Sequence, residues 1–199
     1  MSLPLQPGLS PAPPWFRRLA VLLALVVVVL TLGVIGASRH APATLLITGP
    51  DHAGVYARTV ERMVAQARQR VWAAIYVIFP GDPGGPVHDL LEALAAARAR
   101  GVEVRVAVDC GKDRVTGLPD EKHLAAMKWL QAHDIAVIAD EMGRTTHLKV
   151  VVVDQRFVVL GSHNWTRSAM LDNREASVVL DDPSMAAQLE AQLKGIPGW

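Results

Sequence analysis

Hydrophobic and polar residues follow two different periods along residues 44–195 of this 199-residue chain. Short runs rich in β-branched residues predict strands at 44–48, 71–79, 102–108, 135–139, 148–153, 157–160 and 178–180. Apolar residues at helical spacing predict helices at 56–67, 87–100, 120–133 and 183–193. Because strands and helices alternate almost throughout, we predict an α/β fold in which helices flank a mixed β-sheet.

The first 37 residues have a different pattern. Residues 1–18 are rich in proline, which is typical of a disordered tail. Residues 19–37 are apolar or small except for Thr31, and 19 residues in a helix just cover a bilayer core of about 30 Å. We therefore expect a transmembrane anchor or uncleaved signal at 19–37, followed by a folded domain at 41–199. A cleaved signal peptide is the competing interpretation, which the length of the run disfavours.

Positive charges around this run bear on the predicted orientation. Arg17 and Arg18 precede the run, whereas Arg39 alone closely follows it. Under the positive-inside rule, this bias predicts a single-pass membrane protein whose folded domain lies on the extracytoplasmic or periplasmic side.

Composition narrows the class of protein. About half of the residues (51%) are hydrophobic, which is enough for one domain with a proper core. The 20 basic and 19 acidic residues leave a net charge of +1, so the chain does not hold nucleic acid mainly through a large positive field. The net charge does not exclude a local basic groove. The single cysteine, Cys110, rules out an intrachain disulfide and a cysteine-based metal site.

Polar residues at fixed offsets frame the run of four valines at 150–153. His147 and Lys149 precede it, Asp154 ends it, and Gly161–Asn164 and Asn173–Glu175 follow. Side chains alternate in a strand, so His147 and Lys149 share one face. An imidazole beside an ammonium suits attack on a phosphodiester, because histidine can act as nucleophile or proton donor while lysine binds a non-bridging oxygen.

This spacing resembles the HxKx4Dx6GSxN signature of the phospholipase D superfamily, and every defining position is met. Over residues 44–195 the chain is similar to members with a single HKD motif, namely the small bacterial endonucleases and the mitochondrial cardiolipin hydrolase group. The resemblance implies a phospholipase D-like fold and a phosphodiesterase that works through a phosphohistidine at His147. It also implies chemistry without metal or cofactor.

The resemblance extends to individual residues. The implied catalytic residues are His147, Lys149, Asp154, Ser162, Asn164 and Glu175. Ser162 and Asn164 would stabilise charge in the transition state, and Glu175 would orient the nucleophilic histidine. Asp154 would have a more structural role, close to the partner histidine or the local turn. The expected substrate-binding residues are Gly161 and Asn173 of the motif, together with Lys112 and Arg144, which lie in predicted loops near the motif and could track a phosphate backbone.

A covalent phosphohistidine mechanism needs a second proton-handling group, yet the chain holds one HxK. Family members with one copy pair two chains across a two-fold axis. We therefore predict a homodimer with one shared active site. His163, in the free position of the motif, is the alternative proton donor within one chain.

Three classes of function remain open. An endonuclease acting on DNA or RNA ranks first, because the length and single motif resemble the bacterial endonucleases. A phospholipase D or cardiolipin hydrolase ranks second, and the apolar segment at 19–37 favours lipid slightly. A non-catalytic phosphate-binding adaptor ranks third, since a complete histidine–lysine pair argues against it. The aromatic residues Tyr56, Trp72 and Tyr76 are best interpreted as core.

Overall fold

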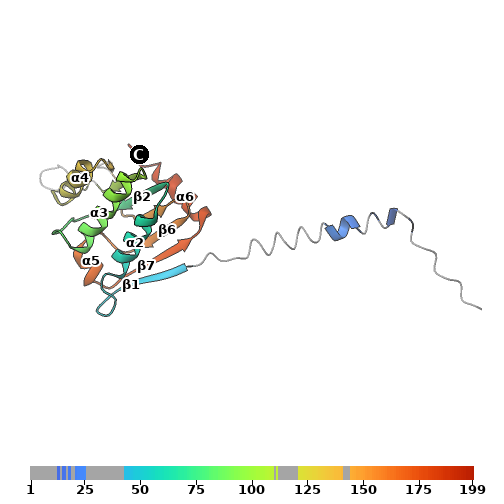
Figure 1. Ribbon diagram of the computed structural model, residues 1–199, viewed down its shortest axis with the longest axis horizontal. Coiled ribbons are helices and arrows are strands. Elements are labelled where there is room, and N and C mark those ends of the chain that lie inside the picture. Colours follow the sequence, from blue (N-terminus) through green and yellow to red (C-terminus); the bar gives the residue numbers. More distant parts are fainter. Residues whose placement is uncertain are drawn as a thin grey trace, which may run out of the picture. The chain divides into compact units, whose positions relative to one another are not determined.

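The computed structural model describes residues 13, 15–16, 18, 21–25, 43–109, 111, 121–140 and 144–199 (Figure 1). The chain divides into two units, residues 1–40 and residues 41–199. The second unit contains the whole of the sheet and its surrounding helices.

Seven strands form one mixed sheet in the order β1-β7-β6-β5-β2-β3-β4. The strands are β1 (Ala43–Thr48), β2 (Arg70–Ile75), β3 (Glu103–Val108), β4 (Ala136–Ala139), β5 (Lys149–Val153), β6 (Phe157–Gly161) and β7 (Glu175–Asp181). β2, β3 and β4 run parallel to one another. The other neighbouring pairs, β1–β7, β7–β6, β6–β5 and β5–β2, are antiparallel. The run of valines therefore lies in β5, at the centre of the sheet.

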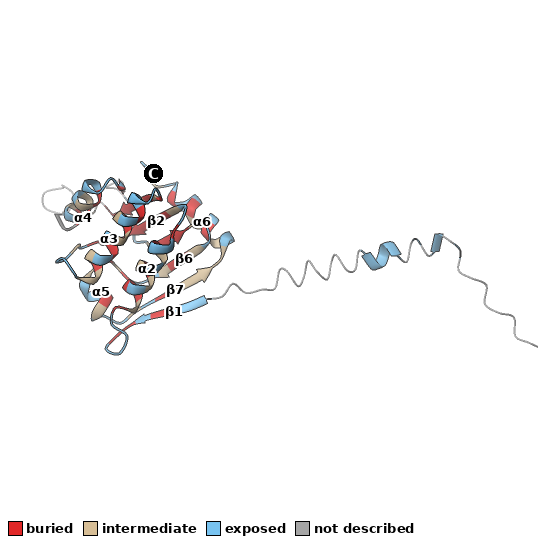
Figure 2. Cartoon of the chain, viewed as in Figure 1, coloured by how far each residue is buried: buried red, intermediate tan, exposed pale blue. Residues whose placement is uncertain are grey.

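Helices cover both faces of this sheet (Figure 2). They are α2 (Val55–Gln66), α3 (Pro86–Ala99), α4 (Glu121–Ala132), α5 (Arg167–Leu171) and α6 (Pro183–Leu193). The larger core joins one sheet face to α2, α3, α4 and α5, and includes Val151 and Leu90, both fully buried. The smaller core lies beneath α6 and includes Val152 and Leu193. The alternation of β5 side chains thus supplies both cores, as expected for a central strand.

The predicted α/β class with a mixed sheet flanked by helices is confirmed, but one boundary is different. The strand predicted at 71–79 ends at Ile75. Beyond it, residues 77–79 exchange backbone hydrogen bonds with Trp165 instead of continuing in the sheet. Ile78 is buried where this segment pairs with Trp165, so the hydrophobic pattern continues past Ile75. The pattern alone therefore does not mark the end of the strand.

The prediction of a single-pass membrane protein with an extracytoplasmic domain is wrong on the present findings. In the part of the chain that the structure describes, no helix combines the length and apolar character needed to cross a membrane. Of the predicted anchor, only residues 21–25 are described, and they are helical. Residues 19–20 and 26–37, and most of the predicted tail at 1–18, lie outside the described residues.

Candidate active site

The histidine and lysine of the motif meet at the start of β5. The Nζ atom of Lys149 lies 3.2 Å from Nε2 of His147 and donates a hydrogen bond of 3.0 Å to the His147 carbonyl oxygen. His147 is exposed, whereas Lys149 is half-buried. A reactive imidazole therefore faces solvent beside a cation that the sheet holds in place.

Tyr76 forms one wall of this pair. Its ring centroid lies 4.4 Å from that of His147, and the Lys149 Nζ lies 4.9 Å from the Tyr76 centroid in cation–π geometry. Tyr76 directly follows β2, and its N–H donates to the carbonyl of Leu148 (2.7 Å). The expectation that Tyr76 is a core residue is therefore wrong: it is half-buried and borders the site. The available signal was its position after the carboxyl end of a buried strand, where ligands often bind.

A second polar group joins the ends of β6 and β7. The Ser162 hydroxyl donates to Oε2 of Glu175 (2.5 Å), and Nδ2 of Asn173 donates to Oε1 (3.0 Å). The Ala176 N–H donates to the Ser162 hydroxyl at 3.0 Å. Ser162 and Asn173 thus occupy both carboxylate oxygens of Glu175, and the expected bond between Glu175 and His147 is not formed among the described residues.

Electrostatics connect these two groups. Partial burial lowers the pKa of the Lys149 ammonium from its ordinary value, and the negative charge of Glu175 opposes that shift. Lys149 and Glu175 also lie on the same face of the sheet, on β5 and β7. The arrangement keeps a carboxylate near the ammonium without pairing the two directly.

The remaining motif residues differ in depth. Gly161 is exposed at the end of β6, where a Cβ atom would collide with the Ala176 carbonyl and the Ser177 side chain. Asn164 is half-buried, and its Oδ1 atom is buried without a hydrogen-bond partner among the described residues. His163 is fully buried, and both of its ring nitrogens are hydrogen-bonded to hydroxyl groups. His163 therefore does not reach the surface as a proton donor.

Asp154 lies away from this group, at the opposite end of β5. Its carboxylate accepts backbone N–H bonds from Arg68, Gln69 and Arg70 at 3.0, 2.8 and 3.1 Å. It therefore caps the turn that leads into β2, and the structure does not bring it to His147. Of the two expected substrate-binding cations, Arg144 is exposed three residues before His147, whereas Lys112 lies outside the described residues.

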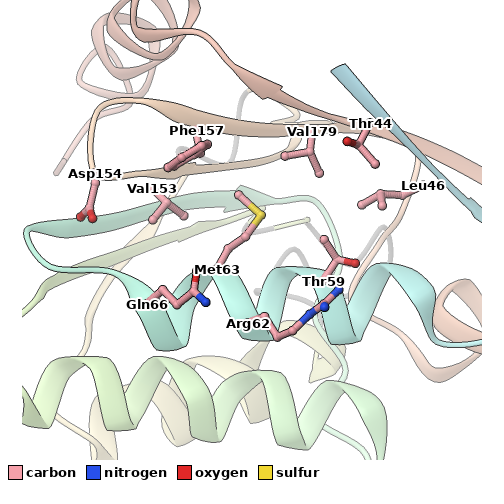
Figure 3. Close-up of a pocket in the computed structure, with 10 residues that line it drawn as sticks. All are labelled: Thr44, Leu46, Thr59, Arg62, Met63, Gln66, Val153, Asp154, Phe157 and Val179. Atoms are coloured by element: carbon pink, nitrogen blue, oxygen red, sulfur yellow. The ribbon is translucent and has the colours of Figure 1, made fainter. Parts of the chain in front are cut away.

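Two cavities differ in their relation to the site. A cavity of about 380 Å³ lies between α2 and the sheet and is lined in part by Asp154, Phe157 and Met63 (Figure 3). It is therefore on the side of the turn into β2, remote from His147. An open depression of about 530 Å³ instead adjoins Ser162 and Glu175. This second depression is therefore the one that adjoins these motif residues.

No group of three or more histidine, cysteine, aspartate or glutamate residues is arranged to hold a metal ion within the described ranges. The site instead offers an exposed imidazole, an adjacent ammonium and a hydroxyl–carboxylate pair. Such groups can attack a phosphorus atom, bind a non-bridging oxygen and donate hydrogen bonds to developing charge.

Comparisons with known proteins identify the family. The His147–Lys149 pair lies at the start of β5, the central strand of the mixed sheet. Residues 60–196 match the family described as "Cardiolipin synthase, PLD-like domain". The chain therefore belongs to the phospholipase D superfamily.

Relatives in this superfamily carry different names. The chain is 31% identical to a mitochondrial cardiolipin hydrolase of Chlamydomonas reinhardtii over 104 residues. This aligned region is 52% of this chain and 44% of that protein. It is 31% identical over 94 residues to a phospholipase D of Rickettsia conorii, covering 47% of this chain and 44% of that protein. The chain thus spans less than half the length of these curated relatives.

Solved structures have the same fold. The phospholipase D family member Nuc from Salmonella typhimurium is similar with a TM-score of 0.62 and 25% identity, over 78% of this chain and 94% of Nuc. NucT from Helicobacter pylori is similar with a TM-score of 0.59 over the same shares, and its 18% identity supports the fold alone.

Proposed function

We propose that this protein is a metal-independent phosphodiesterase that acts through a phosphohistidine at His147, and that its substrate is DNA or RNA, which it cleaves internally. The observation that carries this proposal is the exposed His147 imidazole with the Lys149 Nζ 3.2 Å from Nε2. A nucleophile, a cation for the phosphate and the hydrogen-bonded pair of Ser162 and Glu175 then lie at one edge of the sheet.

The proposed reaction has two balanced steps. First, a ring nitrogen of His147 attacks phosphorus, a P–N bond forms, and the bond from phosphorus to the leaving oxygen breaks as that oxygen gains a proton. Next, water attacks phosphorus, loses a proton and displaces the histidine. Lys149 binds a non-bridging oxygen throughout, which stabilises the charge of the pentacoordinate state.

The proton donor in this scheme is the histidine of a second copy, so the active unit is a homodimer with one shared site. His163 is buried and bonded on both sides, which leaves no second histidine of the motif at the surface. The sheet face that α6 covers is left open at its β1 edge, where Leu45 is 59% exposed and Ile47 is 43% exposed. Leu148, next to His147, is 40% exposed. Ile47 also lines the depression beside Ser162 and Glu175, and these apolar residues suit contact with a second copy of this chain.

Nucleic acid is the favoured substrate because the structural likeness to Nuc covers 94% of that protein, so the two domains are of similar extent. A phospholipid is the second candidate. The likeness to a mitochondrial cardiolipin hydrolase, 31% identical over 104 residues, favours it. Both candidates require the same phosphodiester chemistry at His147.

The test compares the purified protein with its His147→Ala variant in excess EDTA. Labelled single-stranded DNA, double-stranded DNA and RNA form one set of substrates, and micelles containing cardiolipin or phosphatidylglycerol form the other. His133→Ala, which changes an exposed histidine at the end of α4, is the matched control.

Cleavage of nucleic acid by the wild type and His133→Ala, but not by His147→Ala, would support the nuclease. Cleavage of lipid and not of nucleic acid would refute the nuclease and support phospholipid hydrolysis. Binding without turnover, from a folded dimer, would indicate a phosphate-binding adaptor and overturn the proposal.

A further inference from the structure

His163 is completely buried directly beneath the candidate site. Its Nε2 atom lies 2.7 Å from the Thr48 hydroxyl, and its Nδ1 atom lies 2.7 Å from the Ser177 hydroxyl. Thr48 is the last residue of β1, and Ser177 lies in β7. The imidazole therefore links two neighbouring strands to the loop that follows β6.

The ring is also held by aromatic packing. Tyr56 of α2 stacks on it with the centroids 4.2 Å apart and an interplanar angle of 10°. The Tyr56 hydroxyl in turn accepts a hydrogen bond of 3.3 Å from Nε1 of Trp165. Both aromatic partners are fully buried. Hydrogen bonds in the ring plane and a stacked ring on its face leave the imidazole one defined orientation.

This buried ring is directly connected to the reacting groups. Its chain neighbours are Ser162 and Asn164, and Ser162 donates to Glu175 at 2.5 Å. Its two hydrogen-bond partners also pair directly with residues of the motif. Thr48 of β1 pairs with Glu175 of β7, and Ser177 of β7 pairs with Gly161 of β6. A displacement of the ring would move the loop and the carboxylate together.

We propose that His163 is a positioning residue for phosphodiester cleavage. By bridging Thr48 and Ser177, it sets the position of the loop from Ser162 to Asn164 relative to Glu175 and to the phosphate that Lys149 binds. This inference rests on the proposed function and assigns to His163 no contact with substrate.

The chemistry of a neutral imidazole suits this task. It offers one donor and one acceptor on different sides of a rigid ring, and each hydroxyl partner can take the complementary role. Burial lowers the pKa of His163, which favours the neutral form, while the charge of Glu175 opposes that shift. The other groups that face the ring are the hydroxyls of Thr48 and Ser177, and that of Tyr56, whose pKa burial raises to about 12. A phenylalanine would fill the space but leave two buried hydroxyls without their partner.

The test uses substitutions that remove the bridge in parts. Thr48→Val and Ser177→Ala each remove one hydroxyl, His163→Gln can keep one bond, and His163→Phe keeps none. Val64→Ala, a change in the buried core on α2, is the control for lost stability without a contact to His163. We would measure kcat and KM on bis(p-nitrophenyl) phosphate, the melting temperature, and the amide NMR shifts of residues 162, 164 and 176.

We expect His163→Phe to lower kcat by about 10²-fold with little change in KM, as misplaced catalytic groups do. Smaller losses are expected for Thr48→Val and Ser177→Ala, partial rescue for His163→Gln, and wild-type kcat for Val64→Ala. The NMR shifts of the loop should change in the His163 series and not in Val64→Ala.

The proposal is overturned if His163→Phe lowers only the melting temperature while kcat stays at the wild-type value, or if the loop shifts do not change. A wild-type protein that hydrolyses no phosphodiester would refute the proposed function instead. The NMR comparison would then still decide whether His163 positions the loop.

Discussion

Lys149 holds its Nζ atom 3.2 Å from Nε2 of His147 and 3.0 Å from the carbonyl oxygen of the same residue. Lys149 is the first residue of β5, a strand paired on both sides by β2 and β6. The position of the ammonium is therefore set by the central strand. Under the proposed function, the ammonium marks where a non-bridging phosphate oxygen would lie.

Removal of this cation should slow the chemical step. We expect Lys149→Met to lower kcat about 10²- to 10³-fold, as loss of one group that stabilises transition-state charge typically does. Steady-state kinetics on a chromogenic phosphodiester measure the effect. Lys194→Met, at the end of α6, removes a lysine remote from the site and should leave kcat unchanged. A Lys149→Met enzyme with wild-type kcat would contradict the assignment.

The face of the Tyr76 ring should matter more than its hydroxyl. The Lys149 Nζ lies 4.9 Å from the ring centroid, and a cation–π contact contributes about 1 kcal/mol. We therefore expect Tyr76→Leu to lower kcat/KM severalfold and Tyr76→Phe to retain it. Parallel kinetics on the two variants check this. Equal losses in both would instead assign the role to the hydroxyl.

Asp154 should contribute to stability and not to the chemical step. Its carboxylate accepts backbone N–H bonds from residues 68–70, and leaving such donors unsatisfied costs about 1–3 kcal/mol. We expect Asp154→Ala to lower the free energy of unfolding by this amount, measured by urea denaturation, with kcat retained below the transition. Asp172→Ala, which breaks an exposed pair with Arg167, should cost about 0–1 kcal/mol. Loss of kcat at unchanged stability would restore a catalytic role to Asp154.

A charge on the open edge of the sheet should separate the proposed dimer. Leu45 and Ile47 are 59% and 43% exposed on β1. We expect the Leu45→Glu, Ile47→Glu double variant to sediment as a monomer and to lose phosphodiesterase activity, because one chain then lacks the second histidine. Phe79→Glu, at another exposed apolar residue, is the control. An active monomer would show that one chain suffices.

The stability of the protein should depend on pH through His163. Its pKa in the folded state is lowered by burial, so below about pH 6.5 the unfolded chain binds a proton that the folded chain does not. The stability contribution of neutral His163 is therefore present above that pH and is lost as pH falls toward the folded pKa. We expect His163→Asn to have a flatter stability profile below about pH 6.5, measured by urea denaturation. Identical slopes in both proteins would contradict this.

Several parts of the site could be predicted because they depend on local spacing. His147 precedes β5 by two residues, and its side chain lies beside that of Lys149, as the alternation of side chains in an extended chain predicts. The mixed α/β class likewise follows from elements that alternate along the chain. The hydrophobic pattern continues past the end of β2 to the buried contact at Ile78, so it predicts Tyr76 in the core, whereas the folded chain places Tyr76 beside His147.

The residue types and offsets from His147 to Glu175 were enough to identify the superfamily, because such a signature depends only on spacing along the chain. Which of those residues lie close together depends on the folded sheet. Asp154 is five positions from Lys149 but lies at the far end of the same strand, about 16 Å away at strand rise. Tyr76 and Lys149 are remote in sequence and adjacent in the sheet. Strand order and register set such distances, and both depend on how the whole sheet pairs.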